Sequence, residues 1–177
     1  MLPHYREIMQ TAWLGGLSDG TPCGKGSTMA MTVFAREHLP FIVEKYEIKT
    51  LCDAGAGDKH WIQHVEWGVE YDGYDLIPRH KDVKAMDITL EELPNCDAIL
   101  CRFVLGHLDP ASVLRALALF KLSGKYLIAS NVPESDYSTE FYGTFNKWDL
   151  RREPFSLGEP LETYPDCMGH NLSIWKL

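Results

Sequence analysis

The sequence predicts an α/β fold: a three-layer sandwich in which helices cover both faces of a mostly parallel sheet. Short apolar runs alternate with helix-length segments through the middle of the chain, a pattern typical of parallel strands joined by helices. A turn that contains two glycines follows the first of these runs. The last two apolar runs, residues 145–150 and 171–177, have no helix between them and predict an antiparallel C-terminal edge.

Five segments have the character of buried strands in the parallel part of the sheet. Each is short, and glycine or polar residues bound it, as expected for strands covered on both faces. The segments between most of them are long enough to form the connecting helices. The predicted strands are residues 50–53, 68–75, 82–87, 98–101 and 125–130.

Asp109 and Pro110 mark the clearest start of a helix. Aspartate caps the open amides of a first turn, and proline fits the first helical position. The apolar pattern then continues through Phe120. By contrast, the stretch between Asp75 and Asp82 is too short for a crossover helix, so a turn is expected there.

A second helix is expected over residues 28–46, where apolar side chains form a stripe at helical spacing. Ser27 or Thr28 would cap its first turn. Pro40 is expected to break this helix in two or to start a second one. Two shorter helices are expected over residues 5–13 and 58–65.

The composition is that of one globular domain. The chain has 177 residues, of which 45% are hydrophobic and 24% charged, which excludes a disordered or fibrous protein. Its formal net charge is −8, and basic residues occur only in short groups at 79–81 and 151–152. A protein that grips nucleic acid by its phosphates needs a local surplus of lysine and arginine. Nucleic acid is therefore not the expected partner.

The cysteines and the N-terminal sequence indicate a reduced, cytoplasmic and soluble protein. No two cysteines form a CxxC pair, so neither a zinc knuckle nor a redox site of the thioredoxin type is indicated. The N-terminus lacks a basic start followed by an apolar stretch, and no window is long and apolar enough to span a membrane. The five cysteines are Cys23, Cys52, Cys96, Cys101 and Cys167.

The segment Leu51–Asp58 carries the most informative motif. A strand ends at Asp53, and Gly55 and Gly57 then allow a tight turn. Glycine at such a turn lets a ligand approach the backbone closely, because no side chain blocks it. Dinucleotide-binding turns have a third glycine, and His60 stands where that glycine would be. The motif therefore counts against a nicotinamide dinucleotide, and a glycine turn of this kind could also simply connect a strand to a helix.

Two further acids follow the next two strands. Asp75 ends the second strand about twenty residues after the glycine turn, where an acid commonly binds a ribose hydroxyl pair. Asp87 follows the third strand. Because the carboxyl ends of parallel strands meet at one edge of a sheet, the three acids predict an adenosine-shaped site there.

These motifs resemble those of the class I S-adenosylmethionine-dependent methyltransferases. Asp53-Ala-Gly-Ala-Gly57 is similar to the first motif of that family, Asp75 to its ribose-binding acid, and Asp87-Ile88 to the pair beside the adenine ring. Residues 97–108 are similar to its fourth-strand motif. The resemblance covers mainly residues 49–131 and implies a Rossmann-like fold with S-adenosylmethionine as cofactor. It implies these cofactor-binding residues: Asp53, Ala54, Gly55, Gly57, Asp58, Trp61, Asp75, Leu76, Asp87, Ile88 and Arg102.

The predicted helix over 58–65 carries four side chains with open roles. Asp58 would cap the helix or bind the amino group of the cofactor, and Trp61 would pack in the core or form part of the pocket wall. His60 and His64 would share one helical face, but no third ligand is evident. No metal site is therefore expected.

The domain assignment follows from the same motifs. Residues 1–177 are expected to form a single methyltransferase-like domain. Residues 1–48 would supply N-terminal helices and a cofactor lid, 49–131 the cofactor-binding core, and 132–177 the C-terminal strands and acceptor-side loops. Within the first part, residues 18–28 contain Gly-Lys-Gly-Ser-Thr, but the glycine spacing is wrong for a phosphate-binding loop. This segment would be a lid over the cofactor or an ordinary loop.

His107 and Arg102 are the predicted catalytic residues. They follow the fourth strand, whose carboxyl end borders the acceptor pocket in the family that the sequence resembles. A methyl transfer needs a base only if the acceptor carries a proton that must leave, and His107 could take that proton or merely pack in its helix. Arg102 could bind an acidic acceptor or pair with Asp97 or Asp109.

Other polar and aromatic residues are expected near the acceptor. Asn131 ends the fifth strand and could point at the same pocket. A stretch rich in aromatic residues follows it, and these residues could line an acceptor site or simply form core under a loop. They are Tyr137, Phe141, Tyr142, Phe145 and Trp148.

The expected function is transfer of a methyl group from S-adenosylmethionine to a small molecule, a sugar unit or a protein side chain. The motifs that DNA base methyltransferases carry after the fourth strand are absent from Cys101-Arg-Phe-Val104. Two alternatives stay open: a non-catalytic S-adenosylmethionine-binding module that serves a partner protein, and an enzyme that degrades S-adenosylmethionine. A protein partner or a homodimer fits either reading, and no membrane is expected.

Overall fold

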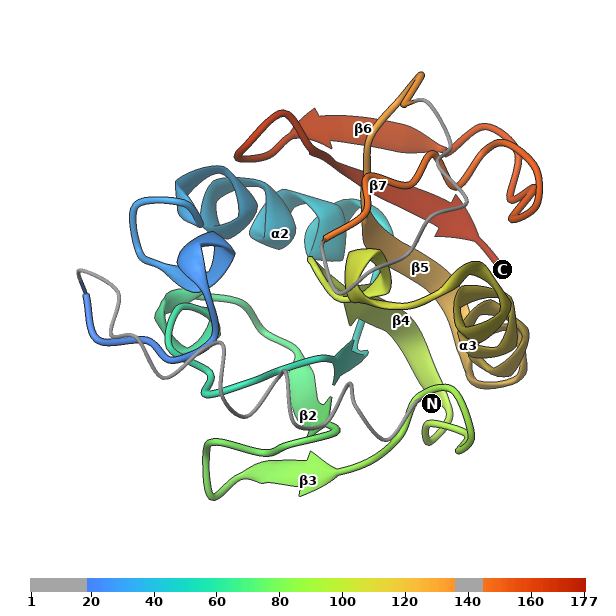
Figure 1. Cartoon of the computed structure of the whole chain (residues 1–177). Helices are drawn as coiled ribbons and strands as arrows, with labels where there is room; N and C mark the ends of the chain where they lie inside the picture. The colour runs from blue at the N-terminus through green and yellow to red at the C-terminus, as the bar shows by residue number, and fades with distance from the viewer. Residues whose placement is uncertain (1–18, 136–144) are drawn as a thin grey trace.

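In the computed structural model of the chain, residues 19–135 and 145–177 are described, so the helix predicted over 5–13 lies outside the described residues. A seven-stranded sheet forms the centre, in the order β3-β2-β1-β4-β5-β7-β6 (Figure 1). Strands β1 to β5 are parallel, and β7 is antiparallel to both of its neighbours. The strands are β1 (Thr50–Ala54), β2 (Glu70–Asp75), β3 (Val83–Ala85), β4 (Cys96–Cys101), β5 (Gly124–Asn131), β6 (Glu162–Pro165) and β7 (Asn171–Lys176).

Two α-helices cover opposite faces of this sheet, α2 (Val33–Lys45) on one and α3 (Pro110–Ser123) on the other (Figure 1). Successive side chains of each strand point to opposite faces. In β4, Leu100 packs with the buried side chains of α2, whereas Ile99 packs with those of α3. The predicted mostly parallel three-layer sandwich with an antiparallel C-terminal edge is confirmed.

Helix α3 begins as the sequence predicts. The Asp109 side chain accepts a hydrogen bond from the backbone N–H of Ser112 at 3.0 Å, and Pro110 occupies the first turn. The helix continues through Ser123 and buries Val113, Leu117 and Phe120 against the sheet. Residues 76–82 form turns, as expected from their short length.

Helix α2 differs from the prediction at its start and at Pro40. Residues 28–32 form turns, and the helix begins at Val33. Pro40 neither breaks the helix nor starts a new one, because α2 continues without interruption through Lys45. Leu39, next to the proline, is fully buried, as is Ile42, so packing against the sheet holds this part of the helix in place.

The prediction of a strand over residues 145–150 is wrong. This segment has no strand pairing, although Trp148 and Leu150 are buried against the α3 side of the sheet. The indole N–H of Trp148 donates to the carbonyl oxygen of Leu105, which satisfies that group without a strand partner. The outer strand of the antiparallel edge is β6 instead, whose residues are half-buried or exposed.

The helix predicted over residues 58–65 is reduced to one 3-10 turn, Ile62–His64. Lys59 has a positive φ of 59°, which is incompatible with a right-handed helix at that position. The Asp58 side chain accepts a hydrogen bond from the backbone N–H of His60 at 3.0 Å, which favours a local turn. Trp61 and Ile62 are nevertheless buried against α2.

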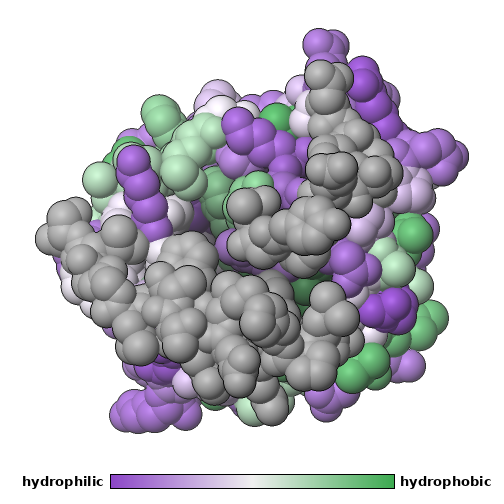
Figure 2. Space-filling view, in the orientation of Figure 1, coloured by the Kyte–Doolittle hydropathy of each residue, from purple (hydrophilic) through white to green (hydrophobic). Residues whose placement is uncertain are grey.

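The surface in this view carries both hydrophilic and hydrophobic residues (Figure 2). Hydrophilic side chains lie over the loop of residues 150–161 at the upper right of the view, and hydrophobic ones lie over α3 at the right, where Leu114 and Leu122 are exposed. Among residues 19–135 and 145–177, no helix has the length and apolar character needed to cross a bilayer.

Candidate functional site

A cavity of about 540 Å³ lies beyond the carboxyl ends of β1, β2 and β4. The strand order reverses between β1 and β4, and ligands of open α/β sheets bind at such a reversal. Every residue that the sequence predicts to bind the cofactor or to be catalytic lines this cavity except Ala54. Ala54 is fully buried in the core on the α3 side of the sheet.

The glycine turn after β1 runs close to other parts of the chain. Gly55 and Gly57 have positive φ values of 108° and 57°, which side chains rarely adopt. A Cβ atom on Gly55 would overlap the Val104 side chain, and one on Gly57 would lie 2.6 Å from the Sγ atom of Cys23. The turn is therefore a bare stretch of backbone that forms one wall of the cavity.

Asp53 is the acid at the end of β1, and it is buried. Its carboxylate accepts a hydrogen bond from the Tyr71 hydroxyl at 2.6 Å. Burial raises the pKa of Asp53 to about 7, although the Tyr71 hydrogen bond and the charge of Arg102 act in the opposite direction. At neutral pH this side chain is therefore close to its titration midpoint.

Asp75 and Asp87 lie at the ends of β2 and β3. The two carboxylate oxygens of Asp75 accept backbone N–H groups of Gly57 at 2.9 Å and Ile77 at 2.8 Å, and burial raises its pKa. Both hydrogen bonds to the Asp87 side chain come from Thr89 and go to Oδ1. Because a carboxylate oxygen can accept two hydrogen bonds, both acids keep capacity for a ligand.

Arg102 forms a buried network at the end of β4. Its guanidinium donates two hydrogen bonds to Asp166, at 2.8 and 2.9 Å. It also donates to the carbonyl oxygens of Gly26 at 2.7 Å and Met31 at 3.0 Å. The sequence-based alternatives that paired Arg102 with Asp97 or with the helix cap at residue 109 are therefore wrong. The geometry supports a positioning role, since Arg102 joins β4 to the β6–β7 loop and to residues 26–31.

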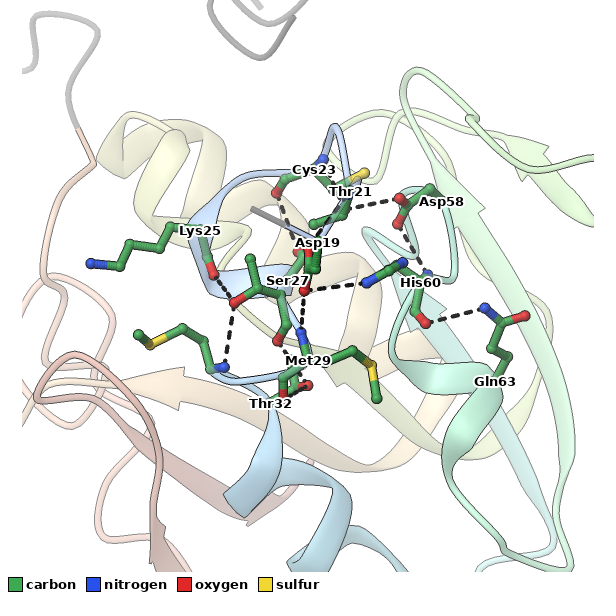
Figure 3. A network of polar contacts seen from close by, with 12 residues as sticks. Asp19, Thr21, Cys23, Lys25, Ser27, Met29, Thr32, Asp58, His60 and Gln63 are labelled. Atoms are coloured by element: carbon green, nitrogen blue, oxygen red, sulfur yellow. Dashed lines mark hydrogen bonds and ion pairs between the residues drawn. The ribbon is translucent and has the colours of Figure 1, made fainter. Parts of the chain in front are cut away.

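Residues 19–32 lie against the glycine turn (Figure 3). The Thr21 hydroxyl donates to the Asp58 carboxylate at 2.9 Å, and Asp19 lies 3.4 Å from His60. Asp19 also accepts the backbone N–H of Met29 at 2.7 Å, which closes the segment into a compact loop. Residues 22–27 line the cavity, as the lid hypothesis requires, and Ser18 lies outside the described residues.

The opposite end of the cavity is lined by aromatic and basic side chains that the sequence only partly indicated. Phe145 and His107 were expected there, and their rings meet edge to face at 4.8 Å. Burial lowers the pKa of His107 to about 4, so its imidazole is neutral at physiological pH. Phe103 and His170 were not expected, because a single histidine in a turn gives no signal in the sequence.

Two further expectations about this end are corrected. Asn131 does not line the cavity; its side-chain oxygen accepts the backbone N–H of Leu150 at 2.7 Å and holds the segment after residue 145 against β5. Trp148 belongs to the core. Tyr137, Phe141 and Tyr142 lie outside the described residues. Over residues 19–135 and 145–177, no group of three or more side chains is arranged to hold a metal ion.

Comparisons with known proteins find likeness in structure alone. No family model matches the sequence, and no curated protein matches it. Many solved structures match, and several of them are S-adenosylmethionine-dependent methyltransferases. The fold is that of the class I S-adenosylmethionine-dependent methyltransferases.

Three of these structures illustrate the likeness. The pyocyanin biosynthetic protein PhzM matches with a TM-score of 0.62 and 14% identity, over 84% of this chain and 56% of PhzM. The N-terminal domain of EvdMO1 with bound SAH (S-adenosylhomocysteine) matches with a TM-score of 0.59 and 13% identity, over 97% and 96% of the two chains. Magnesium protoporphyrin IX methyltransferase from Synechocystis PCC 6803, also with bound SAH, matches with a TM-score of 0.55 and 12% identity, over 83% and 85%. The chain thus spans little more than half of PhzM.

Proposed function

We propose that this protein binds S-adenosylmethionine in the cavity and transfers its methyl group to a small acceptor. One observation carries the proposal: the bare glycine turn and the acids at the ends of β1, β2 and β3 line a single cavity where the strand order reverses. An adenosine ligand needs close approach to the backbone and acids for its ribose, and this cavity supplies both.

The residues present fit the cofactor. Asp75 would bind the ribose hydroxyls, and Asp87 with Ile88 would border the adenine ring, as the resemblance implies. The backbone at Gly55 and Gly57 leaves room that a Cβ atom would fill. Asp58 and the segment that packs on it would border the methionine end. When bound, S-adenosylmethionine supplies an electrophilic methyl group on a positively charged sulfur.

The charge distribution of the cavity supports the same reading. Four acids line the end where the cofactor would bind and outnumber the two arginines there, Arg79 and Arg102, which favours a ligand that carries positive charge. The four acids are Asp53, Asp58, Asp75 and Asp87. The opposite end carries His107, His170 and Lys147 instead. A cavity of about 540 Å³ is of the size that holds one drug-sized ligand, so the acceptor portion is small.

Calorimetric titration with S-adenosylmethionine and with SAH tests this proposal. We expect both to bind the wild-type protein and to bind Asp53→Ala and Asp75→Ala at least about tenfold more weakly, because each variant removes a hydrogen-bonding carboxyl group that lines the cavity. Asp72→Asn is the matched control, since Asp72 lies on the same strand as Asp75 but does not line the cavity.

Failure of the wild-type protein to bind either ligand would overturn the proposal. Binding with no methylated product from any acceptor would favour the non-catalytic module. Consumption of S-adenosylmethionine without an acceptor would favour the degrading enzyme. Release of SAH that depends on an added acceptor would support the methyltransferase.

A further inference from the structure

His170 is a buried histidine with one unused nitrogen. It lies between β6 and β7, and only 5% of its surface is exposed. Its Nδ1 atom lies 3.2 Å from the carbonyl oxygen of Met168. In the part of the chain that the structure describes, Nε2 has no hydrogen-bond partner. Buried polar atoms nearly always have a hydrogen-bond partner. An unpaired Nε2 atom in a residue that lines the cavity therefore points to a ligand that supplies the partner.

The contact at Nδ1 fixes the tautomer. A carbonyl oxygen can only accept a hydrogen bond, so Nδ1 carries the proton and Nε2 keeps its lone pair. Burial lowers the pKa of His170, and the positive charge of Lys147 acts in the same direction, against the opposing effects of Asp166 and the nearby backbone. The ring is therefore neutral near physiological pH, and Nε2 is a hydrogen-bond acceptor.

Flat side chains surround His170 at the acceptor end of the cavity. Its ring packs on Phe103 with centroids 4.5 Å apart and meets Phe145 at 5.5 Å. Phe145 in turn contacts His107. These four rings form an aromatic wall, which favours a planar ligand that stacks on it. The wall lines the cavity together with Lys147, whose charge favours an oxygen that becomes negative.

We propose that Nε2 of His170 accepts the proton of a hydroxyl group on a small aromatic acceptor that stacks on this wall. The inference rests on the proposed function. It gives His170 the role that the sequence suggested for His107. The ring of His107 packs on Phe145 with centroids 4.8 Å apart, whereas the unpaired Nε2 atom at this end of the cavity belongs to His170.

The step balances as follows. The acceptor O–H bond breaks, its proton moves to Nε2, and the oxygen keeps the electron pair. The oxygen then forms a bond to the methyl carbon while the carbon–sulfur bond breaks and its electron pair goes to sulfur. The sulfonium becomes a neutral thioether, and the imidazolium later releases its proton to water.

The test uses the full chain saturated with SAH and 4-nitrophenol as a probe of the acceptor end. Three forms are compared: wild type, His170→Phe, and His64→Gln as a control at an exposed histidine outside the cavity. The phenylalanine keeps a flat ring beside Phe103 but removes Nε2. Calorimetry measures the affinity of the probe, and 15N NMR of the histidine side chains reports the tautomer of His170.

We expect wild type and His64→Gln to bind the probe equally and His170→Phe to bind it about tenfold more weakly, which is the effect of one lost hydrogen bond. In wild type, Nε2 of His170 should be unprotonated before the probe is added and should shift when it binds. Equal binding by His170→Phe, a proton on Nε2 in the free protein, or no probe binding by SAH-loaded wild type would each overturn the inference.

The SAH titration separates this inference from the function on which it rests. If wild type does not bind SAH, the proposed function fails, and the inference fails with it. If only His170→Phe loses SAH binding, the substitution has disturbed the fold. The NMR measurement on the wild-type protein then decides alone.

Discussion

Asp53 shows how burial, the largest of several effects, shifts the pKa of a side chain in the cavity. Its pKa is raised to about 7 in the folded protein, against about 3.9 for an exposed aspartate. Between these two values the folded chain keeps a proton that the unfolded chain releases. The contribution of Asp53 to stability is therefore complete below about pH 4 and is lost as the pH rises to about 7.

The asparagine of Asp53→Asn does not titrate. We therefore expect the free energy of unfolding of wild type, relative to that of Asp53→Asn, to fall by roughly 1 kcal/mol per pH unit between about pH 4 and about pH 7. Urea unfolding at a series of pH values measures it. Asp82→Asn is the control, because the Asp82 side chain is mostly exposed. Parallel stability curves for wild type and Asp53→Asn would contradict the assignment.

Gly55 is the second test at the level of single residues. Gly55→Ala combines a positive φ with overlap against Val104, whereas Gly158→Ala meets a positive φ of 73° with no atom near the new Cβ. We expect Gly158→Ala to cost about 1–2 kcal/mol of stability and to keep SAH affinity. Gly55→Ala should cost more and should weaken SAH binding, as measured by chemical denaturation and calorimetry. Equal effects of the two changes would show that the space at Gly55 does not matter.

At the level of elements, the buried pair of Arg102 and Asp166 holds three parts of the chain together. Asp166→Ala leaves the guanidinium charge uncompensated, and we expect it to cost roughly 3–5 kcal/mol. Adding Arg102→Leu removes that stranded charge, so the double variant should lose less stability than the sum of the single ones. Denaturant unfolding of the four proteins checks this. An additive result would mean that the two side chains act independently.

The elements also show which parts of the fold a sequence can predict. Strands β1, β4, β5 and β7 were predicted because each contains a short apolar run that the sheet buries, and the more polar β2 and the short β3 were predicted as well. Edge strand β6 was missed because Glu162-Thr-Tyr-Pro165 is half-exposed and polar. Residues 145–150 were misread as a strand because Trp148 and Leu150 are buried beside the sheet without pairing in it.

The candidate site also has one part that the sequence could predict and one part that it could not. The end of the cavity with the glycine turn was predictable because its glycines and acids lie at fixed places after successive strands. The end with His107 and His170 was not, because it is assembled by contacts between distant residues. Asp166 lies 64 positions from Arg102, and His170 belongs to a turn that only the antiparallel pairing of β7 brings to the cavity. No local pattern in the sequence indicates such contacts between residues that are far apart along the chain.

For the whole molecule, cofactor binding should appear as thermal stabilisation. The cavity is lined by residues from both halves of the sheet and from residues 22–27, so a ligand in it contacts all of them. At a concentration about 100 times its Kd, SAH should stabilise the chain by about 2.7 kcal/mol and raise Tm by about 5–10 °C. Differential scanning calorimetry measures the shift. Asp72→Asn should show the same shift, and Asp75→Ala, with about tenfold weaker binding, about half of it or less; an equal shift in Asp75→Ala would contradict the ribose role.

The placement of β7 between β5 and β6 has a consequence for the order in which the protein is made. A ribosome releases the glycine turn and the acids of β1 to β3 early, but Asp166, Met168 and His170 emerge only with the last strands. A nascent chain that ends before residue 166 holds Arg102 without its counterion and lacks one wall of the cavity. Such a chain carries the glycine turn and the acids that follow β1 to β3, yet its pocket becomes complete only when the C-terminal hairpin closes the sheet.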